Sequence, residues 1–195
     1  RFRRERRGPK GRTAEIERMV ARSLRGAIDL YQLGPIALNV DCDILNADGG
    51  TRCASVTAAA MAMRLAVRRL IAGGDCLPPV LRPTYEERKG GWVALTLSAE
   101  ERFAHEAAVI PFDIAAVSVG LIDGQTYLDL DYMLDSNADV DLNVVMLADG
   151  SIVEVQGTGE ESTFSRQELA EMLDLAEVGL AQINTIQQQT LSVIE

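Results

Sequence analysis

The sequence has little of the residue types on which several enzyme and scaffold classes depend. Its 195 residues include a single histidine, His105, and no Gly-x-Ser-x-Gly motif, which argues against a Ser-His-Asp hydrolase. The three cysteines, Cys42, Cys53 and Cys76, form no Cys-x-x-Cys pair, which argues against a disulfide framework and against a zinc site. We therefore expect a reducing, cytoplasmic environment with each cysteine as a small apolar side chain, and a solvent-facing or structural His105.

Long apolar runs are missing as well. No stretch reaches the roughly 18 apolar residues that a membrane-spanning helix requires, and no apolar segment follows the basic N-terminus as in a signal peptide. With 47% hydrophobic and 25% charged residues, the composition is that of an ordinary globular protein. We expect no membrane association. Because the chain starts without Met inside a charged run, we also expect its start to be cut.

Charge is unevenly distributed along the chain. The first twelve residues, RFRRERRGPKGR, hold seven basic residues and one acidic residue, whereas the whole chain has a formal net charge of −10. A basic arm on an acidic body can contact a polyanion locally. Two interpretations stay open for this arm, which are contact with nucleic-acid phosphates and a solvated terminus or tag.

Hydrophobic periodicity divides the rest of the chain into helical and extended segments. Apolar residues recur at helical spacing over 13–33, over 51–71 and in a long C-terminal segment, which Ser165 caps with Glu168 in a capping box. Residues 36–43 alternate between apolar and polar side chains and predict a strand, and further strands are predicted over 113–122, 127–134, 141–147 and 152–156. Asp123-Gly124 predicts a hairpin turn between two of these strands.

The segment 75–112 is the least regular and contains the only tryptophan, Trp92. It permits a strand over 92–97 and a short helix over 98–109, with Ser98 as the cap. We divide the chain into a basic arm, 1–12, and one domain, 13–195, in which 75–112 is a variable insertion. The order helix-strand-helix, variable segment, four strands and helix is typical of an α+β layer protein.

A glycine-rich turn, Asp48-Gly49-Gly50-Thr51-Arg52, joins the predicted strand at 36–43 to the predicted helix at 51–71. The free N–H groups of a first helical turn, a threonine hydroxyl and a guanidinium all favour an anion, and phosphate fits best. The spacing matches neither a Walker A loop nor a dinucleotide fingerprint. The alternative is a plain glycine turn with a capping threonine and a surface arginine.

A second candidate is the acidic turn Asp135-Ser-Asn-Ala-Asp-Val-Asp141, between two predicted strands. Such a cluster can bind a divalent cation through oxygen ligands or supply a general acid. It lacks the glycine and the distant glutamate of an EF-hand, and a solvated acidic turn is the alternative. An anion site beside a metal-binding acidic turn suits phosphoryl transfer.

Five stretches together resemble the ribonuclease PH family. They are GRTAEIERMVARSLR (11–25), DCDILNADGGTRCAS (41–55), AAVSVGL (115–121), DLDYMLDSNADVDLNVVM (129–146) and DGSIVEVQGTGE (149–160). They occur in the family's order and cover most of the chain outside 75–112. The resemblance implies an α+β fold of the ribonuclease PH type with two layers, sheet and helix. The strands that family members have before the basic arm are not seen in this chain.

The resemblance also implies a reaction and its site. Inorganic phosphate, as co-substrate, attacks the last phosphodiester of an RNA and releases a nucleoside diphosphate, which makes the enzyme a 3′→5′ exoribonuclease of tRNA precursors. The residues that correspond to the family's phosphate site are Arg12, Gly50, Thr51 and Arg52. Asp135 and Asp141 correspond to the carboxylates that bind Mg²⁺ and support proton transfer to the leaving 3′ oxygen.

The same resemblance implies partners. The basic arm lies where family members present arginines to RNA, so we expect Arg3, Arg4, Arg6 and Arg7 to contact tRNA 3′ ends. The family assembles as a ring of six subunits, a trimer of dimers, and we expect a homohexamer here. The long segment 75–112, with Trp92, departs from the family pattern.

Two other functions stay open. A non-catalytic RNA-binding or ring-scaffold subunit of the same family typically loses the arginine or the aspartate pair, and this chain retains both Arg52 and Asp135/Asp141. A small-molecule phosphotransferase would share the anion-binding turn, but no nucleotide-binding loop is recognisable in the sequence.

Overall fold

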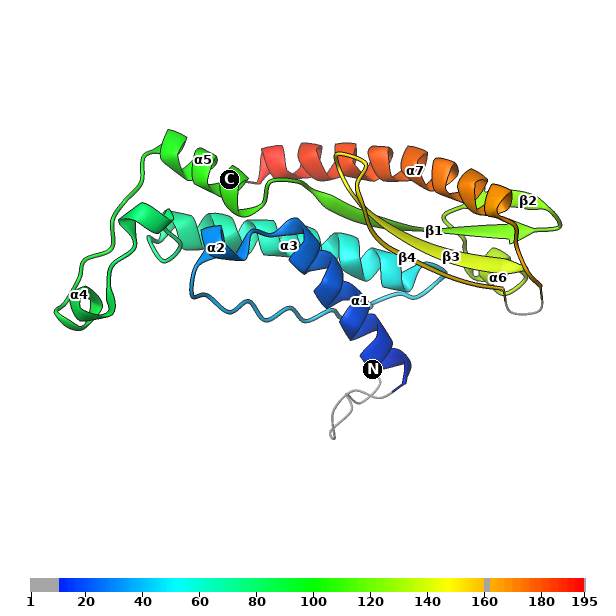
Figure 1. Ribbon diagram of the computed structural model, residues 1–195, viewed down its shortest axis with the longest axis horizontal. Coiled ribbons are helices and arrows are strands. Elements are labelled where there is room, and N and C mark those ends of the chain that lie inside the picture. The colour runs from blue at the N-terminus through cyan, green and yellow to red at the C-terminus, as the bar shows by residue number, and fades with distance from the viewer. Residues whose placement is uncertain (1–10, 160–161, 195) are drawn as a thin grey trace.

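The computed structural model describes residues 11–159 and 162–194, in which four strands form one antiparallel sheet (Figure 1). The strands are β1 (Ile114–Ile122), β2 (Gln125–Leu128), β3 (Val140–Leu147) and β4 (Ile152–Gly159), and their order across the sheet is β2-β1-β3-β4. The register places Asp141 of β3 between Gly120 and Thr158, and Asn143 between Ser118 and Gln156. Polar side chains of three strands therefore lie in adjacent rows at one end of the sheet.

Helices surround this sheet and extend beyond it. They are α1 (Arg12–Ala27), α2 (Leu30–Leu33), α3 (Thr51–Ala72), α4 (Tyr85–Lys89), α5 (Ala99–Val109), α6 (Tyr132–Asp135) and α7 (Arg166–Val193), with a short 3₁₀ helix at Pro79–Leu81. Ser98 and Ser165 cap α5 and α7 in capping boxes with Glu101 and Glu168, as the sequence predicts. In Figure 1 the segment that carries α4 projects from the end of the molecule opposite the sheet.

Helices cover both faces of the sheet. Strand β1 presents apolar side chains to both faces of the sheet. Ala116 packs toward α3 and α1, whereas Ala115 and Val117 pack toward α7. A strand with two apolar faces is stable only when both are covered. The α+β class is therefore confirmed, but the expected two-layer arrangement becomes helix-sheet-helix.

The largest differences from the predicted elements lie in the predicted strands. Residues 36–43 and 92–97 are not strands, because a strand requires a partner for its backbone hydrogen bonds and no strand of the described residues pairs with them. The predicted strand 127–134 ends at Leu128, since Asp129 has a positive φ of 57° and Asp131 caps α6. The predicted helix 13–33 is two helices, because α1 ends at Ala27 and Asp29 caps the start of α2.

Residues 36–44 follow an extended path along α1. They enclose with α1 a largely apolar groove of about 720 Å³, which also reaches Thr51 at the start of α3. Val40, Ile44 and Leu45 are exposed. The groove lies beside the glycine-rich turn, but neither Arg52 nor Asp135 nor Asp141 lines it, so we do not assign the chemistry to it.

A network of ion pairs attaches α5 and the end of α7 to α3. Glu106 of α5 pairs with Arg64 at 2.9 Å and with Arg68 at 2.8 Å, and Arg64 also pairs with Asp113 at 2.8 Å. Arg68 donates to the carbonyl oxygen of Leu191 at 3.0 Å. None of the helices of the described part is long and apolar enough to cross a membrane.

Candidate active site

The glycine-rich turn is held against the segment that leads into α6. Asp48 Oδ1 accepts hydrogen bonds from the N–H of Gly49 at 3.0 Å and from the N–H of Tyr132 at 2.7 Å. A Cβ on Gly49 would lie 1.9 Å from the carbonyl oxygen of Leu130, so that only glycine fits. The glycine at this position thus serves the packing of two chain segments, and this packing fixes the turn beside the acidic residues.

The turn ends at the N-terminus of α3. Gly50 is the N-cap residue, with a positive φ of 64°, and it supplies no side chain to cap the helix. The first N–H groups of a helix have no partner within the helix, and the helix dipole favours negative charge there. Thr51 and Arg52 are the first two residues of this 22-residue helix. The predicted phosphate-binding residues of the turn are therefore brought together at one helix end.

Arg52 points from this helix end toward α1 and β4. Its Nη2 lies 3.3 Å from Glu15 Oε1, and Gln156 Nε2 donates to the same carboxylate oxygen at 2.9 Å. Among the described residues, Arg52 Nε and Gln156 Oε1 are buried without a hydrogen-bond partner. A buried donor without a partner is costly, which favours an additional ligand at Arg52.

Arg12 is placed one helical turn from this group. It is the exposed first residue of α1, and Glu15, which contacts Arg52, follows three positions later. Positions three apart lie on the same side of a helix. Arg12 thus lies on the side of α1 that carries Glu15, one turn before the residue that contacts Arg52. The predicted RNA-binding residues Arg3, Arg4, Arg6 and Arg7 lie outside the described residues.

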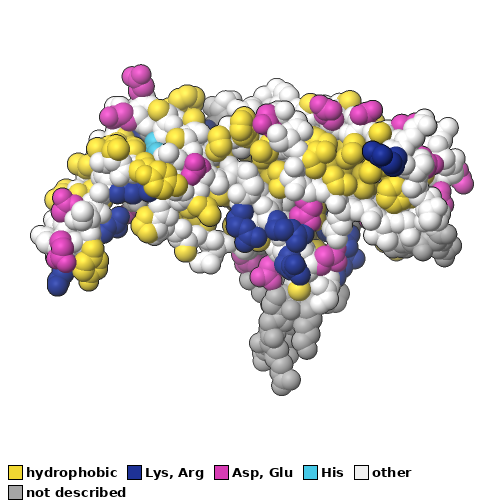
Figure 2. All heavy atoms as spheres, in the orientation of Figure 1, with side chains coloured by type: hydrophobic (Ala, Val, Ile, Leu, Met, Phe, Trp, Pro, Cys, Tyr) yellow, Lys and Arg dark blue, Asp and Glu magenta, His cyan; other side chains and the backbone are white. Residues whose placement is uncertain are grey.

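Basic side chains continue along α1. Figure 2 shows Lys and Arg side chains gathered over this helix, with acidic side chains among them. Arg18, Arg22 and Arg25 of α1 are exposed, and Arg22 pairs with Glu154 of β4.

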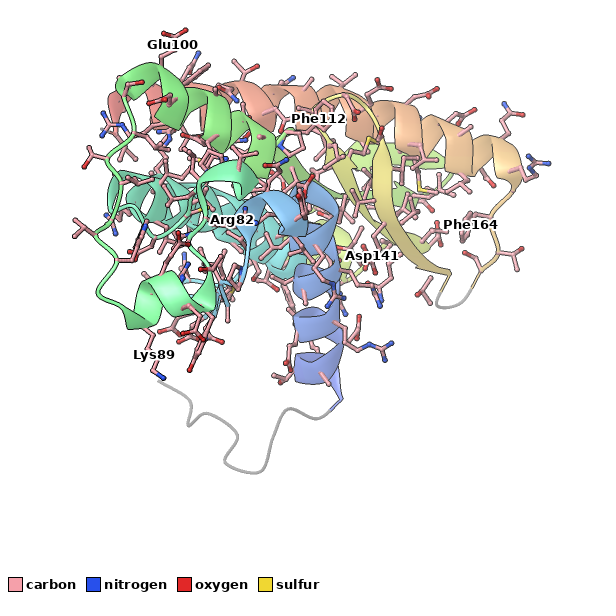
Figure 3. The ribbon with its side chains drawn as sticks, turned by 60° about the vertical axis from the view of Figure 1, so that its left-hand side comes forward. Arg82, Lys89, Glu100, Phe112, Asp141 and Phe164 are labelled. Atoms are coloured by element: carbon pink, nitrogen blue, oxygen red, sulfur yellow. The ribbon has the colours of Figure 1, made fainter. Side chains whose placement is uncertain are left out.

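Asp141 lies in β3 on the side of the sheet that faces α1 and α3. In Figure 3 it lies beside α1 and the sheet, far from Lys89 at the tip of the α4 segment. Asn143 Nδ2 lies 3.5 Å from Asp141 Oδ2, and Cys53 of α3 lies beneath them. Burial, together with the negative charge of Asp141, raises the pKa of the Cys53 thiol to about 12, although the nearby Arg52 acts in the opposite direction. The structure thus brings Asp141 close to the start of α3.

Other acidic residues in and just before the predicted turn have different surroundings. Asp131 Oδ1 accepts from the N–H of Leu134 at 2.8 Å, and Asp139 Oδ2 accepts from the N–H of Asp123 at 2.9 Å, so both stabilise the local backbone. Asp135 is the exposed last residue of α6. Asp135 and Asp141 are therefore separated by the bend 136–139, with Asp135 toward solvent and Asp141 toward α3.

The donor set at these two positions fits Mg²⁺. Mg²⁺ usually takes one or two carboxylates together with phosphate oxygens and water, and Asp135 and Asp141 are carboxylates of the kind that it binds. No cluster of three or more His, Cys, Asp or Glu side chains with metal-binding geometry is present in the described residues. In the described residues, Asp135 and Asp141 are thus two carboxylates and not a complete set of metal ligands.

Sequence reasoning missed three polar residues of this site, which are Glu15, Asn143 and Gln156. Each depends on the tertiary structure, because Glu15 and Gln156 meet across α1 and β4, and Asn143 meets Cys53 across α3 and β3. Glu15 lies three residues after Arg12 and Asn143 two residues after Asp141, but this spacing does not identify the partner of either residue, and Gln156 has no comparable signal. His105 is buried, with Nε2 3.6 Å from Cys76 Sγ, and burial lowers its pKa, so it does not face solvent.

Two family models match two separate regions of the chain. The model of the 3′ exoribonuclease family, domain 1, matches residues 1–68, and that of domain 2 matches residues 114–179. Ribonuclease PH of Crocosphaera subtropica is 42% identical over 182 residues, which are 93% of this chain and 64% of that protein. Ribonuclease PH of Corynebacterium kroppenstedtii is 46% identical over 183 residues, 94% of this chain and 61% of that protein. The chain thus spans less than two thirds of the length of these relatives.

Solved structures share the fold. Rice (Oryza sativa) Rrp46 superposes with a TM-score of 0.57 at 13% identity, over 94% of this chain and 68% of that one. The Archaeoglobus fulgidus exosome with RNA bound to the active site gives a TM-score of 0.56 at 17% identity, over 92% of this chain and 63% of that one. With both domain models and the relatives matched in sequence, the chain belongs to the ribonuclease PH family of 3′ exoribonucleases.

Proposed function

We propose that this chain carries the reaction centre of a phosphate-dependent 3′→5′ exoribonuclease that trims tRNA precursors and releases nucleoside diphosphates. One observation carries the proposal. Arg52, with a buried and unpartnered Nε, lies at the uncapped start of α3, next to the strand that presents Asp141. An anion site and a carboxylate are thus neighbours, as phosphoryl transfer to a phosphate nucleophile requires.

The chain's own residues would bind the nucleophile and assist the leaving group. Phosphate would be bound by the backbone N–H groups of Gly50 and Thr51 and by the Thr51 hydroxyl. The guanidinium groups of Arg52 and Arg12 would bind it as well. A bond forms between a phosphate oxygen and the phosphorus of the last phosphodiester, and the bond from that phosphorus to the 3′ oxygen breaks. The arginines offset the negative charge that gathers as two phosphates approach.

The leaving 3′ oxygen requires a proton or an equivalent positive charge. Asp141 and Asp135 are the residues that would supply or direct it, together with bound Mg²⁺, which would act as a Lewis acid toward the phosphate oxygens. Asp141 has the more fixed position, because it lies in β3 beside Asn143, whereas Asp135 is exposed at the end of α6.

We also propose the partners and organisation that the family implies. Residues 1–12 would form an RNA-binding arm on the domain 13–195, and the exposed arginines of α1 would extend its basic surface. The segment 75–112 would be a variable insertion, which is supported by its place between the two matched regions, 1–68 and 114–179. Likeness to chains of the archaeal exosome core supports assembly into a ring, which we propose is a homohexamer. The three free thiols support a reducing, cytoplasmic location.

The test is the release of nucleotides from a 3′-labelled RNA with Mg²⁺, with and without inorganic phosphate. The expected result is nucleoside diphosphate released only with phosphate, with release strongly reduced in Arg52→Ala and lost in Asp141→Ala. Nucleoside monophosphate released without phosphate would mean a hydrolytic mechanism. No release from a folded preparation that still binds RNA would favour the non-catalytic scaffold subunit. Native mass spectrometry of the same preparation would measure the number of subunits.

A further inference from the structure

A buried polar pair lies beneath the proposed reaction centre. Asn143 of β3 is 5% exposed and Cys53 of α3 is 3% exposed. The Cys53 thiol donates to Asn143 Oδ1 over 3.1 Å, and Asn143 Nδ2 lies 3.5 Å from Asp141 Oδ2. The three side chains form a chain of contacts that runs from buried Cys53 through Asn143 to the Asp141 carboxylate. Neither Asn143 nor Cys53 has a place in the reaction proposed above.

The contacts determine which way the Asn143 amide is turned. A carboxylate only accepts hydrogen bonds, so the amide must present its NH₂ group to Asp141 and its oxygen to Cys53. The reverse orientation would place the amide oxygen against the carboxylate and leave the thiol without its acceptor. At neutral pH the thiol keeps its proton, because burial and neighbouring negative charge raise the pKa of Cys53 to about 12. The thiol is therefore a lasting donor that distinguishes the two amide orientations.

The same contacts connect the two halves of the site. Cys53 follows Arg52 directly in the first turn of α3, and Asn143 follows Asp141 on the same face of β3. A contact between Cys53 and Asn143 therefore fixes the start of α3 relative to the part of β3 that carries the carboxylate. Side chains that orient a reacting group in this way typically change rates about 10–100-fold when they are removed.

We propose that Asn143 is a positioning residue that holds the Asp141 carboxylate toward the phosphate-binding turn, and that Cys53 fixes the orientation of the Asn143 amide. This inference rests on the proposed function, because that function gives Asp141 its place in the reaction. It assigns no direct contact with substrate to either residue. It predicts that their loss changes the chemical step rather than the binding of phosphate.

The first test compares Asn143→Ala and Asn143→Asp with the unchanged protein in the phosphorolysis assay. Asn143→Ala should lower kcat at least tenfold, with a KM for phosphate within about twofold of the unchanged value, because Arg52 and Thr51 are intact. Asn143→Asp should lower kcat further, since a second carboxylate would repel Asp141. A purely structural residue would instead lower the yield of active protein and leave kcat per active site and its ratio to KM unchanged.

The second test addresses the thiol and keeps the proposal testable if the Asn143 variants fail to fold. Cys53→Ala should lower kcat several-fold, whereas Cys53→Ser, which retains a donor, should restore most of it. Cys76→Ala and Cys76→Ser are the matched controls, because Cys76 is also buried but donates to the carbonyl of Leu33, away from the site. Equal kcat values for Cys53→Ala, Cys53→Ser and the unchanged protein would overturn the assignment of Cys53.

Crystal structures of the unchanged protein, Asn143→Ala and Cys53→Ala provide a readout that does not require activity. The Asp141 carboxylate should keep one orientation in the unchanged protein and change or lose it in both variants. If the unchanged protein shows no phosphorolysis, the proposed function fails, while these structures still decide whether Asn143 and Cys53 orient Asp141. If the protein is active and Asn143→Ala has an unchanged kcat and an unchanged Asp141, the function stands and this inference is wrong.

Discussion

Replacement of Arg52 by alanine should raise the KM for phosphate about a hundredfold. The guanidinium uses Nη2 in its contact with Glu15, whereas the buried Nε has no partner among the described residues. A hydrogen bond to a charged group contributes about 1.5–3 kcal/mol. Two such bonds from one planar guanidinium to phosphate contribute about 3 kcal/mol, and about 1.4 kcal/mol corresponds to a tenfold change in affinity.

The loss of Arg52 also leaves Glu15 without its cation, and the freed carboxylate would repel phosphate. The double variant Arg52→Ala/Glu15→Gln separates these effects, because glutamine can still pair with Gln156 but carries no charge. Its KM should fall relative to Arg52→Ala and remain at least about tenfold above that of the unchanged protein.

The assay is the initial rate of nucleoside diphosphate release at increasing phosphate concentration and fixed RNA concentration. Arg69→Ala is the matched control, since Arg69 is exposed in the last turn of the same helix, far from its N-terminus. It should leave the KM for phosphate unchanged. The assignment of the anion site to the start of α3 would be refuted by an Arg52→Ala variant whose KM lies within twofold of the control.

Three further predictions concern stability and thiol chemistry. Gly49→Ala should lower the free energy of unfolding by about 1–3 kcal/mol or more in urea titrations, because its Cβ would meet the Leu130 carbonyl oxygen; an unchanged midpoint would contradict this close packing. Glu106→Ala should cost about 3 kcal/mol in the same measurement, since it leaves Arg64 and Arg68 partly buried without their shared carboxylate, while the KM for phosphate of the folded enzyme stays constant. Because the folded-state pKa of Cys53 is raised to about 12, its contribution to stability is complete below the pKa of a free thiol and is lost as pH rises toward 12. Unfolding midpoints measured above pH 9 should therefore fall less steeply for Cys53→Ser than for the unchanged protein, and parallel curves would argue against a buried, protonated thiol.

Local signals in the sequence were sufficient for much of the fold. The helices 51–72 and 166–193 follow from apolar periodicity and, for the second, from the Ser165–Glu168 capping box, because such contacts lie within a few residues of one another. The hairpin at Asp123-Gly124 likewise depends on the conformational preferences of two residues, and Asp123 indeed has a positive φ of 50°.

Long-range contacts set the limit of that prediction. The segment 36–43 has the alternation of a strand, but pairing depends on a partner that a local pattern does not contain. In the candidate site, Arg52 and Asp141 were identified through motifs, whereas Asn143 and Gln156 were not. Their importance depends on the register that places them side by side on β3 and β4, below α3 and α1. Spacing along the sequence does not reveal such cross-strand neighbours.

The contact of Gly49 with Leu130 and the bond from Tyr132 N–H to Asp48 lie at a boundary between two independently recognised segments of the chain. Arg12, Glu15 and Arg52 belong to the region matched by domain 1, and Asp135, Asp141 and Asn143 belong to the region matched by domain 2. The groups that we propose bind the nucleophile and those that we propose assist the leaving group are therefore supplied by different segments, and they meet only when these segments are docked. A bound phosphate that contacts both would act as a thermodynamic bridge between them, so that substrate occupancy and the integrity of this internal interface would rise and fall together.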